Sequence, residues 1–253
     1  MTLAFDLPTV RESPMRHWDA RWKVASILLA VGLIAPLRTM LPALVASVLM
    51  VIVAAAARVR PIWLARRLGV VLMLLAFFTV WLPFFDPSNL RVEVLGLSLS
   101  IPGLERFGVL MAKTAAIVGL ILSLAASAPL DELFAASHRL HVPGPIVQVV
   151  LLAYRFVHLL AEEFGRLRTA LRVRAFRNRA NMHSWRTIGN VSGTLLVRSS
   201  DRAERVAQAM RCRGFDGQFR TLQAFRTRWF DVTCFALVSV AAAGILFWDV
   251  ARR

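Results

Sequence analysis

Two short segments of the chain carry the same arginine-bearing pattern. Residues 170–176 read ALRVRAF and residues 209–215 read AMRCRGF, so both fit A-[LM]-R-x-R-[AG]-F. A guanidinium presents a planar fork of N–H donors that suits carboxylates. At the end of an apolar helical stripe it can enter a partner's groove and pair with a buried carboxylate, and a small residue after it lets the partner's backbone come close. The candidate docking residues are therefore Arg172, Arg174, Ala175, Arg211, Arg213 and Gly214.

The same pattern also fits an ordinary helix C-terminus. Glycine is common just after a helix, as Gly214 would be, and arginine in the last turn complements the helix dipole. The repetition of the pattern within one chain favours a paired docking device. The two interpretations are compatible.

Lys113 is a charged residue in the middle of an apolar run. On insertion scales an ionised side chain at the centre of a membrane helix costs about 2.5–3.5 kcal/mol, so it must face protein or water. We expect either a contact with another subunit or a pairing inside the chain, for example with Glu105 or Glu132.

Tyr154, Arg155, Glu162 and Glu163 fall on one expected helix. Internal ion pairing is the simpler interpretation. The functional one is that these residues orient the helices that carry the docking motifs.

Catalytic motifs are missing from the sequence. A phosphate-binding loop needs Gly-Lys, but the two lysines follow Trp22 and Ala112, and neither H-E-x-x-H nor G-x-S-x-G occurs. Glu162-Glu163 followed by Arg166 is similar to the motif of glutamate-based membrane proteases, with a spacing short by one residue. An intramembrane protease or another membrane-embedded enzyme is the alternative class. We expect no catalytic residue, metal site or cofactor in this chain.

Apolar and charged residues are segregated along the chain. It is 57% hydrophobic, yet its net charge is +16. The stretch 24–57 is too long for one span and holds Arg38 between two prolines, which indicates two short helices joined by a tight turn. Further spans are expected at about 68–85, 104–126 and 229–248, and the alternating residues 91–101 indicate a small β-hairpin. The expected fold is therefore an all-α polytopic membrane protein with about five transmembrane helices.

The distribution of basic residues predicts the orientation. Lysine and arginine number four before the first span, then one, four and two in the next three loops, seventeen in 130–228 and two after the last span. Basic loops stay in the cytoplasm. This places the N-terminus and residues 130–228 inside and the C-terminus outside. Nucleic acid is not an expected partner, because the basic segment lies between membrane spans.

The expected domains are a transmembrane region at 1–129, a cytoplasmic coupling domain at 130–228 and a last transmembrane helix at 229–253. Within the middle domain, residues 146–177 form an amphipathic helix whose apolar stripe ends at Arg174. A second helix is expected to begin near Asp201 and to end at the second motif. No run of 130–228 is long enough to span.

Several segments together resemble one known family. They are Trp18–Lys23 (WDARWK), Ser127–Leu133 (SAPLDEL), Tyr154–Glu163 (YRFVHLLAEE) and the two arginine motifs. The chain resembles the transmembrane T-component of energy-coupling-factor (ECF) ABC transporters, and most closely the CbiQ branch of cobalt importers. In the first motif Val173-Arg174-Ala175 replaces the usual Ala-Arg-Gly or Ala-Arg-Ser.

The resemblance implies a non-catalytic coupling subunit in the bacterial inner membrane. Two long cytoplasmic helices would dock into two ABC ATPase subunits, with Arg174 and Arg213 reaching acidic residues there. ATP would bind to those subunits and not to this chain. Their motion would pass to a separate membrane protein that captures the substrate, with cobalt favoured over nickel, and a small accessory membrane protein could join them.

Overall fold

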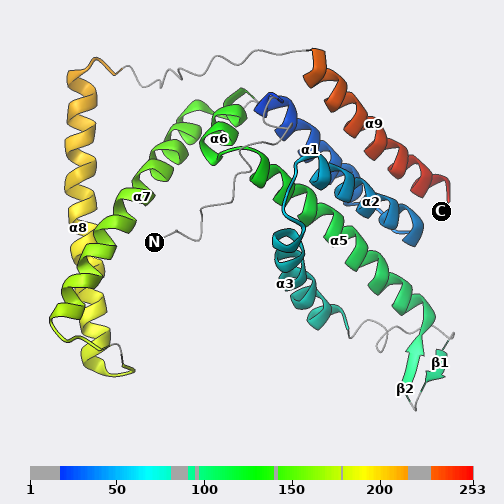
Figure 1. Cartoon of the computed structure of the whole chain (residues 1–253), viewed down its shortest axis with the longest axis horizontal. Coiled ribbons are helices and arrows are strands. Elements are labelled where there is room, and N and C mark those ends of the chain that lie inside the picture. Colours follow the sequence, from blue (N-terminus) through cyan, green and yellow to red (C-terminus); the bar gives the residue numbers. More distant parts are fainter. Residues whose placement is uncertain are drawn as a thin grey trace. The chain divides into compact units, whose positions relative to one another are not determined.

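The computed structural model describes residues 18–80, 91–94, 97–139, 142–177, 179–215 and 229–252. Contacts divide the chain into two compact units. The bundle unit holds α1 (Ala20–Ile34), α2 (Met40–Ala56), α3 (Pro61–Thr79), β1 (Arg91–Val94), β2 (Leu97–Ser100), α5 (Ile101–Ser127), α6 (Leu130–Arg139) and α9 (Trp229–Ala251). The α7–α8 unit holds α7 (Gly144–Val173) and α8 (Met182–Cys212). Labels follow Figure 1.

Several expected elements are confirmed. The stretch 24–57 forms two helices separated by a short turn around Arg38. The two strands pair antiparallel from Arg91 with Ser100 to Val94 with Leu97. Pro61 begins α3 at the first helical position, where its missing N–H costs nothing. The end of the expected third span, 81–85, lies outside the described residues.

α5 is the central helix of the bundle unit and packs against α1, α2 and α3. Its closest neighbour is α2. A Cβ built on Gly119 would lie 2.5 Å from Cγ of Met50, so a larger residue there would force the Met50 side chain to shift. Nearer the start of both helices, the hydroxyl of Ser47 donates to the carbonyl of Ala112 at 3.1 Å. These contacts rise together in residue number, so α2 and α5 run in the same direction.

α9 is tied to the N-terminal helices at both ends by a buried aspartate. The backbone N–H of Asp19, the N-cap of α1, donates to Asp231 at 3.0 Å. Near the other end, Asp249 accepts the backbone N–H groups of Arg38 at 3.3 Å and Thr39 at 2.9 Å. The starts of α1 and α9 therefore lie together, and the end of α9 lies at the turn that follows α1. The two helices are parallel, while α2 and α5 run in the opposite direction beside them (Figure 1).

α6 packs against α1 at the same end of the bundle as Asp231. Ala136 of α6 is fully buried. The ammonium of Lys23, itself 1% exposed, interacts electrostatically with the carboxylates of Glu132, Asp19 and Asp231. The starts of α1, α6 and α9 therefore meet around one buried lysine.

Length and composition identify the helices that can cross a membrane. They are α3, α5, α7 and α9, with α2 as a shorter apolar helix. The chain is a polytopic membrane protein, and apart from the hairpin the regular structure of its described part is helical. The expectation that no run of 130–228 is long enough to span was wrong for α7, because residues 144–161 contain a single charged residue, Arg155.

α8 begins earlier than the sequence indicates. The structure starts it at Met182, not near Asp201. Residues 182–200 are rich in Gly, Ser, Thr and Asn, which have low helix propensity. For this reason the sequence does not predict the first half of the helix. α7 and α8 follow each other with only residues 174–181 between them.

Candidate docking site at the ends of α7 and α8

Both copies of the arginine pattern fold into the same helix ending. At the end of α7, the N–H of Phe176 donates to the carbonyl of Leu171 at 3.0 Å, and that of Ala175 donates to Arg172 at 3.0 Å. At the end of α8, Phe215 donates to Met210 at 3.1 Å and Gly214 donates to Arg211 at 3.0 Å. This pair of bonds defines the Schellman motif. The interpretation as a helix C-terminus is confirmed for both copies.

The Schellman geometry explains the small residue of the pattern. Its C′ position has a positive φ, +55° at Ala175 and +73° at Gly214. The left-handed conformation costs a non-glycine residue roughly 1–2 kcal/mol, so glycine fits this position best and alanine is strained. The requirement for a small residue therefore has a cause within the chain, independent of any partner.

The arginines of both helix ends are directed to solvent. Arg174 and Arg213 occupy the C-cap positions, and Arg172 and Arg211 lie in the last turns. All four are exposed. The only ion pair among the described residues joins Arg198 to Glu163, so none of these four guanidiniums has a carboxylate partner there. Each helix end thus offers two unpaired guanidiniums on a fixed backbone turn.

The turn after α7 is held against the first turn of α8. The rings of Phe176 and His183 lie 6.4 Å apart. The N–H of Arg179 donates to the hydroxyl of Ser184 at 3.2 Å, and Ser184 is buried. The first arginine motif therefore lies at the start of α8, and the second at its end. With 31 residues in α8, the two are about 45 Å apart at 1.5 Å per residue.

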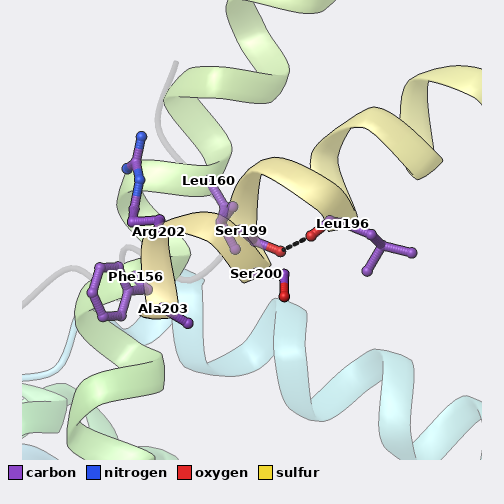
Figure 2. A pocket seen from close by; sticks show the side chains of 7 residues that line it. All are labelled: Phe156, Leu160, Leu196, Ser199, Ser200, Arg202 and Ala203. Atoms are coloured by element: carbon purple, nitrogen blue, oxygen red, sulfur yellow. Dashed lines mark hydrogen bonds between the residues drawn. The ribbon is translucent and has the colours of Figure 1, made fainter. Parts of the chain in front are cut away.

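α7 and α8 cross at one place, where polar and apolar contacts fix them together. Glu163 of α7 forms its ion pair with Arg198 of α8. Beside it, a cavity of about 550 Å³ is lined by Phe156 and Leu160 of α7 and by residues of α8, among them Leu196 and Arg202. Figure 2 shows the lining side chains, which come from both helices, with the hydroxyl of Ser199 donating to the carbonyl of Leu196 at 2.8 Å. The partner of Glu163 thus comes from the other helix.

The neighbours of Glu163 do not share its role. Glu162 and Arg155 are exposed, and neither forms an ion pair within the described part of the chain. The ring of Tyr154 packs edge-on against His158 with centroids 5.2 Å apart. In the described part of the chain, the ion pair of Glu163 joins α7 to α8.

Lys113 has a partner that the sequence did not suggest. Its ammonium donates to the carbonyl of Ala35 at 3.1 Å, and neither Glu105 nor Glu132 forms an ion pair in the described structure. Ala35 is the C-cap of α1, where helix carbonyls lack intrahelical partners and the dipole is negative. The expected pairing inside the chain is therefore present, but its acceptor is the last carbonyl region of α1 and not one of the two glutamates.

A family model described as "Cobalt transport protein", CbiQ, matches residues 11–223. The chain belongs to the CbiQ family. This match includes both arginine motifs and ends before α9.

Curated relatives of this CbiQ-family chain include proteins named for two different metals. The cobalt transport protein CbiQ of Rhodobacter capsulatus is 32% identical over 128 residues, 50% of this chain and 52% of that protein. The nickel permease LarQ of Lactiplantibacillus plantarum is 27% identical over 120 residues, 47% and 43% of the two chains. An uncharacterised protein of Methanocaldococcus jannaschii is 26% identical over 136 residues, 53% and 50%. The chain spans about half the length of the curated relatives it matches.

Asp231 and Asp249 hold the bundle of the CbiQ-family chain together, and neither is predicted from the sequence. A signal was present, because they are the only acidic residues of α9. Their separation is about five helical turns, which places both on one face of the helix.

Proposed function

We propose that this CbiQ-family chain is the membrane-embedded coupling subunit of an ATP-driven ECF-type importer for a transition-metal ion. The observation that carries the proposal is the pair of matched Schellman endings. Each presents a C-cap arginine that has no carboxylate partner among the residues the structure describes, and the two lie about 45 Å apart along α8. A single small domain is about 30 Å across. Two copies of one partner, one at each helix end, therefore fit this spacing better than a single pocket would.

The partner in this proposal is a pair of ABC ATPase subunits with acidic grooves. A carboxylate in such a groove would pair with Arg174 in one subunit and with Arg213 in the other. Closure of the ATPases on ATP would then move the ends of α7 and α8. The Glu163–Arg198 pair and the contacts around it would make the two helices move as one body.

The arrangement of the bundle unit supports the proposal that residues 130–228 lie on one side of the membrane. The starts of α6 and α9 lie at the same end of the bundle, beside Lys23. Because the chain leaves the bundle and returns to it at the same end, the segment between the starts of α6 and α9 must cross the membrane an even number of times or not at all. α8 carries charged residues along its length and is not among the helices able to cross. A single crossing by α7 would therefore place α9 at the wrong end.

The charge distribution favours the cytoplasm for this side. If α7 crossed, the 12 arginines of 174–228 would lie outside, against the positive-inside rule. α7 is instead proposed to lie at the membrane surface, with its apolar first half against lipid or against the substrate-capture protein.

The transported ion is proposed to be cobalt or nickel, with cobalt tested first because the relative of highest identity quoted above bears that name. The ion would be bound by the separate capture subunit. The competing class, a glutamate-based membrane protease, gains no support from the geometry, since Glu163 is paired with Arg198 and Glu162 is exposed.

Co-purification tests this proposal. The affinity-tagged full chain, extracted from its native membrane in mild detergent, should bring with it ABC ATPase subunits and a further membrane protein. Deletion of its gene should abolish uptake of radioactive cobalt or nickel at nanomolar concentration. If the chain purifies without an ATPase from a strain with intact uptake, the proposal is wrong.

A further inference from the structure

The turn between α2 and α3 and the first two turns of α3 carry a cluster of exposed arginines. Arg58, Arg60, Arg66 and Arg67 fall within ten residues and are all exposed. The sequence contains no acidic residue from 58 to 85. In the part of the chain that the structure describes, Arg60, Arg66 and Arg67 have no carboxylate partner. The cluster is called the α3 basic turn below.

Trp63 gives the α3 basic turn a fixed platform. It is half-buried and packs against the small cluster formed by Ala57, Val59 and Ala126. The guanidinium carbon of Arg67 lies 4.7 Å from the centre of the Trp63 ring. Stacking of this kind holds the guanidinium by its face and leaves the N–H groups along its edge free to donate. Arg67 is therefore oriented in advance for an anion with several oxygen acceptors.

The rest of α3 is apolar and open beyond this turn. None of its residues is buried. Val70, Met73, Leu74 and Phe77 are between 61% and 78% exposed. Because α3 is one of the helices able to cross the membrane, these side chains are available to acyl chains. The basic turn then lies at the depth of the headgroups, where tryptophan is also enriched.

We propose that the α3 basic turn binds the headgroup of an anionic phospholipid, with the acyl chains of that lipid lying along α3. The charge fits a phosphate, and the apolar surface directly beyond it fits the attached chains. A soluble acidic protein or free phosphate would use only the first of these two features. The predicted orientation also places the turn on the cytoplasmic side, where anionic lipids attract basic segments. This proposal does not depend on the metal or on the ATPase partner.

The test uses the purified full chain in nanodiscs and native mass spectrometry. The probes are phosphatidylglycerol and, as the neutral lipid, phosphatidylcholine. The wild type should retain phosphatidylglycerol preferentially. The triple variant Arg60→Gln, Arg66→Gln, Arg67→Gln should bind it about tenfold or more weakly, since each basic residue near the surface adds to the attraction for anionic lipid. The matched control Arg168→Gln, Arg186→Gln, Arg205→Gln removes the same charge from exposed positions of α7 and α8 and should bind as the wild type does.

Further variants keep the test decisive. Trp63→Leu should weaken the preference while leaving the charge unchanged, and Arg67→Lys should weaken it less than Arg67→Gln. Excess inorganic phosphate should not displace the lipid. The proposal is overturned if the triple variant and its control lose phosphatidylglycerol equally. It is also overturned if free phosphate competes, or if the triple variant loses ATPase co-purification while lipid binding is unchanged.

Discussion

Asp249, near the end of α9, accepts hydrogen bonds from both the backbone N–H and the hydroxyl of Thr39, at 2.9 and 2.6 Å. Thr39 is the N-cap of α2, and its own side chain does not cap that helix. A fully buried carboxylate of the last helix thus caps the second one, and it also explains how the chain turns tightly around Arg38. The capping is a contact between residues 210 positions apart.

Removal of this carboxylate should destabilise the bundle unit. Hydrogen bonds to charged acceptors contribute about 1.5–3 kcal/mol, so Asp249→Ala should lower the thermal unfolding midpoint in detergent by several degrees. Asp249→Asn keeps one acceptor oxygen and should cost less. Asp201→Ala, at an exposed position of α8, is the control and should leave the midpoint unchanged. Equal midpoints for Asp249→Ala and this control would mean that the cap does not stabilise the fold.

Substitutions at the two C′ residues should show whether backbone strain, and not contact with a partner, is the reason for a small residue at these positions. Ala175→Gly relieves the positive φ and should stabilise the end of α7, whereas Gly214→Ala should destabilise the end of α8, each by about 1 kcal/mol. Hydrogen exchange of the Phe176 and Phe215 amides, which close the two Schellman motifs, would measure both changes. If Ala175→Gly speeds exchange at Phe176, backbone strain is not the reason for a small residue here.

The Glu163–Arg198 pair should hold the crossing of α7 and α8 while contributing little to stability. Arg198 is 55% exposed, and exposed pairs typically contribute about 0.2–1 kcal/mol. Spin labels on Cys212 and on Val173→Cys, both exposed, report the distance between the two helix ends. Glu163→Gln should broaden that distance distribution, and the swapped pair Glu163→Arg, Arg198→Glu should narrow it again. If the distance distribution is unchanged in Glu163→Gln, the apolar contacts alone hold α7 and α8 in their orientation.

Thiol labelling tests the orientation predicted from the basic residues. Cys212 is exposed at the end of α8, and Cys234 is half-buried in α9. A membrane-impermeant maleimide should label neither cysteine in intact cells and should label Cys212 in inverted vesicles stripped of partners. Labelling of Cys212 from outside sealed cells would reverse the orientation of 130–228.

Features set by local sequence could be predicted, and features set by distant contacts could not. The break around Arg38, the hairpin at 91–101 and the two helix endings follow from prolines, alternation and the small C′ residue. The carbonyl partner of Lys113 is 78 positions away, and the residue paired with Glu163 lies 35 positions away. Such pairings depend on how helices cross, which periodicity does not specify. The start of α8 was missed because its first half lacks a continuous apolar stripe.

The most direct test of the coupling proposal reverses the charge at both helix ends. If Arg174 and Arg213 each pair with a carboxylate in a different ATPase subunit, loss of either pair should cost about 2–5 kcal/mol of docking free energy. ATPase co-purification and metal uptake are measured at equal membrane abundance for Arg174→Glu, Arg213→Glu and the double variant, with Arg168→Glu, Arg205→Glu as the matched control. The double variant should lose both ATPase binding and uptake, each single variant should lose less, and the control should retain both. Normal assembly and uptake in the double variant would contradict the proposal and leave these arginines as helix caps only.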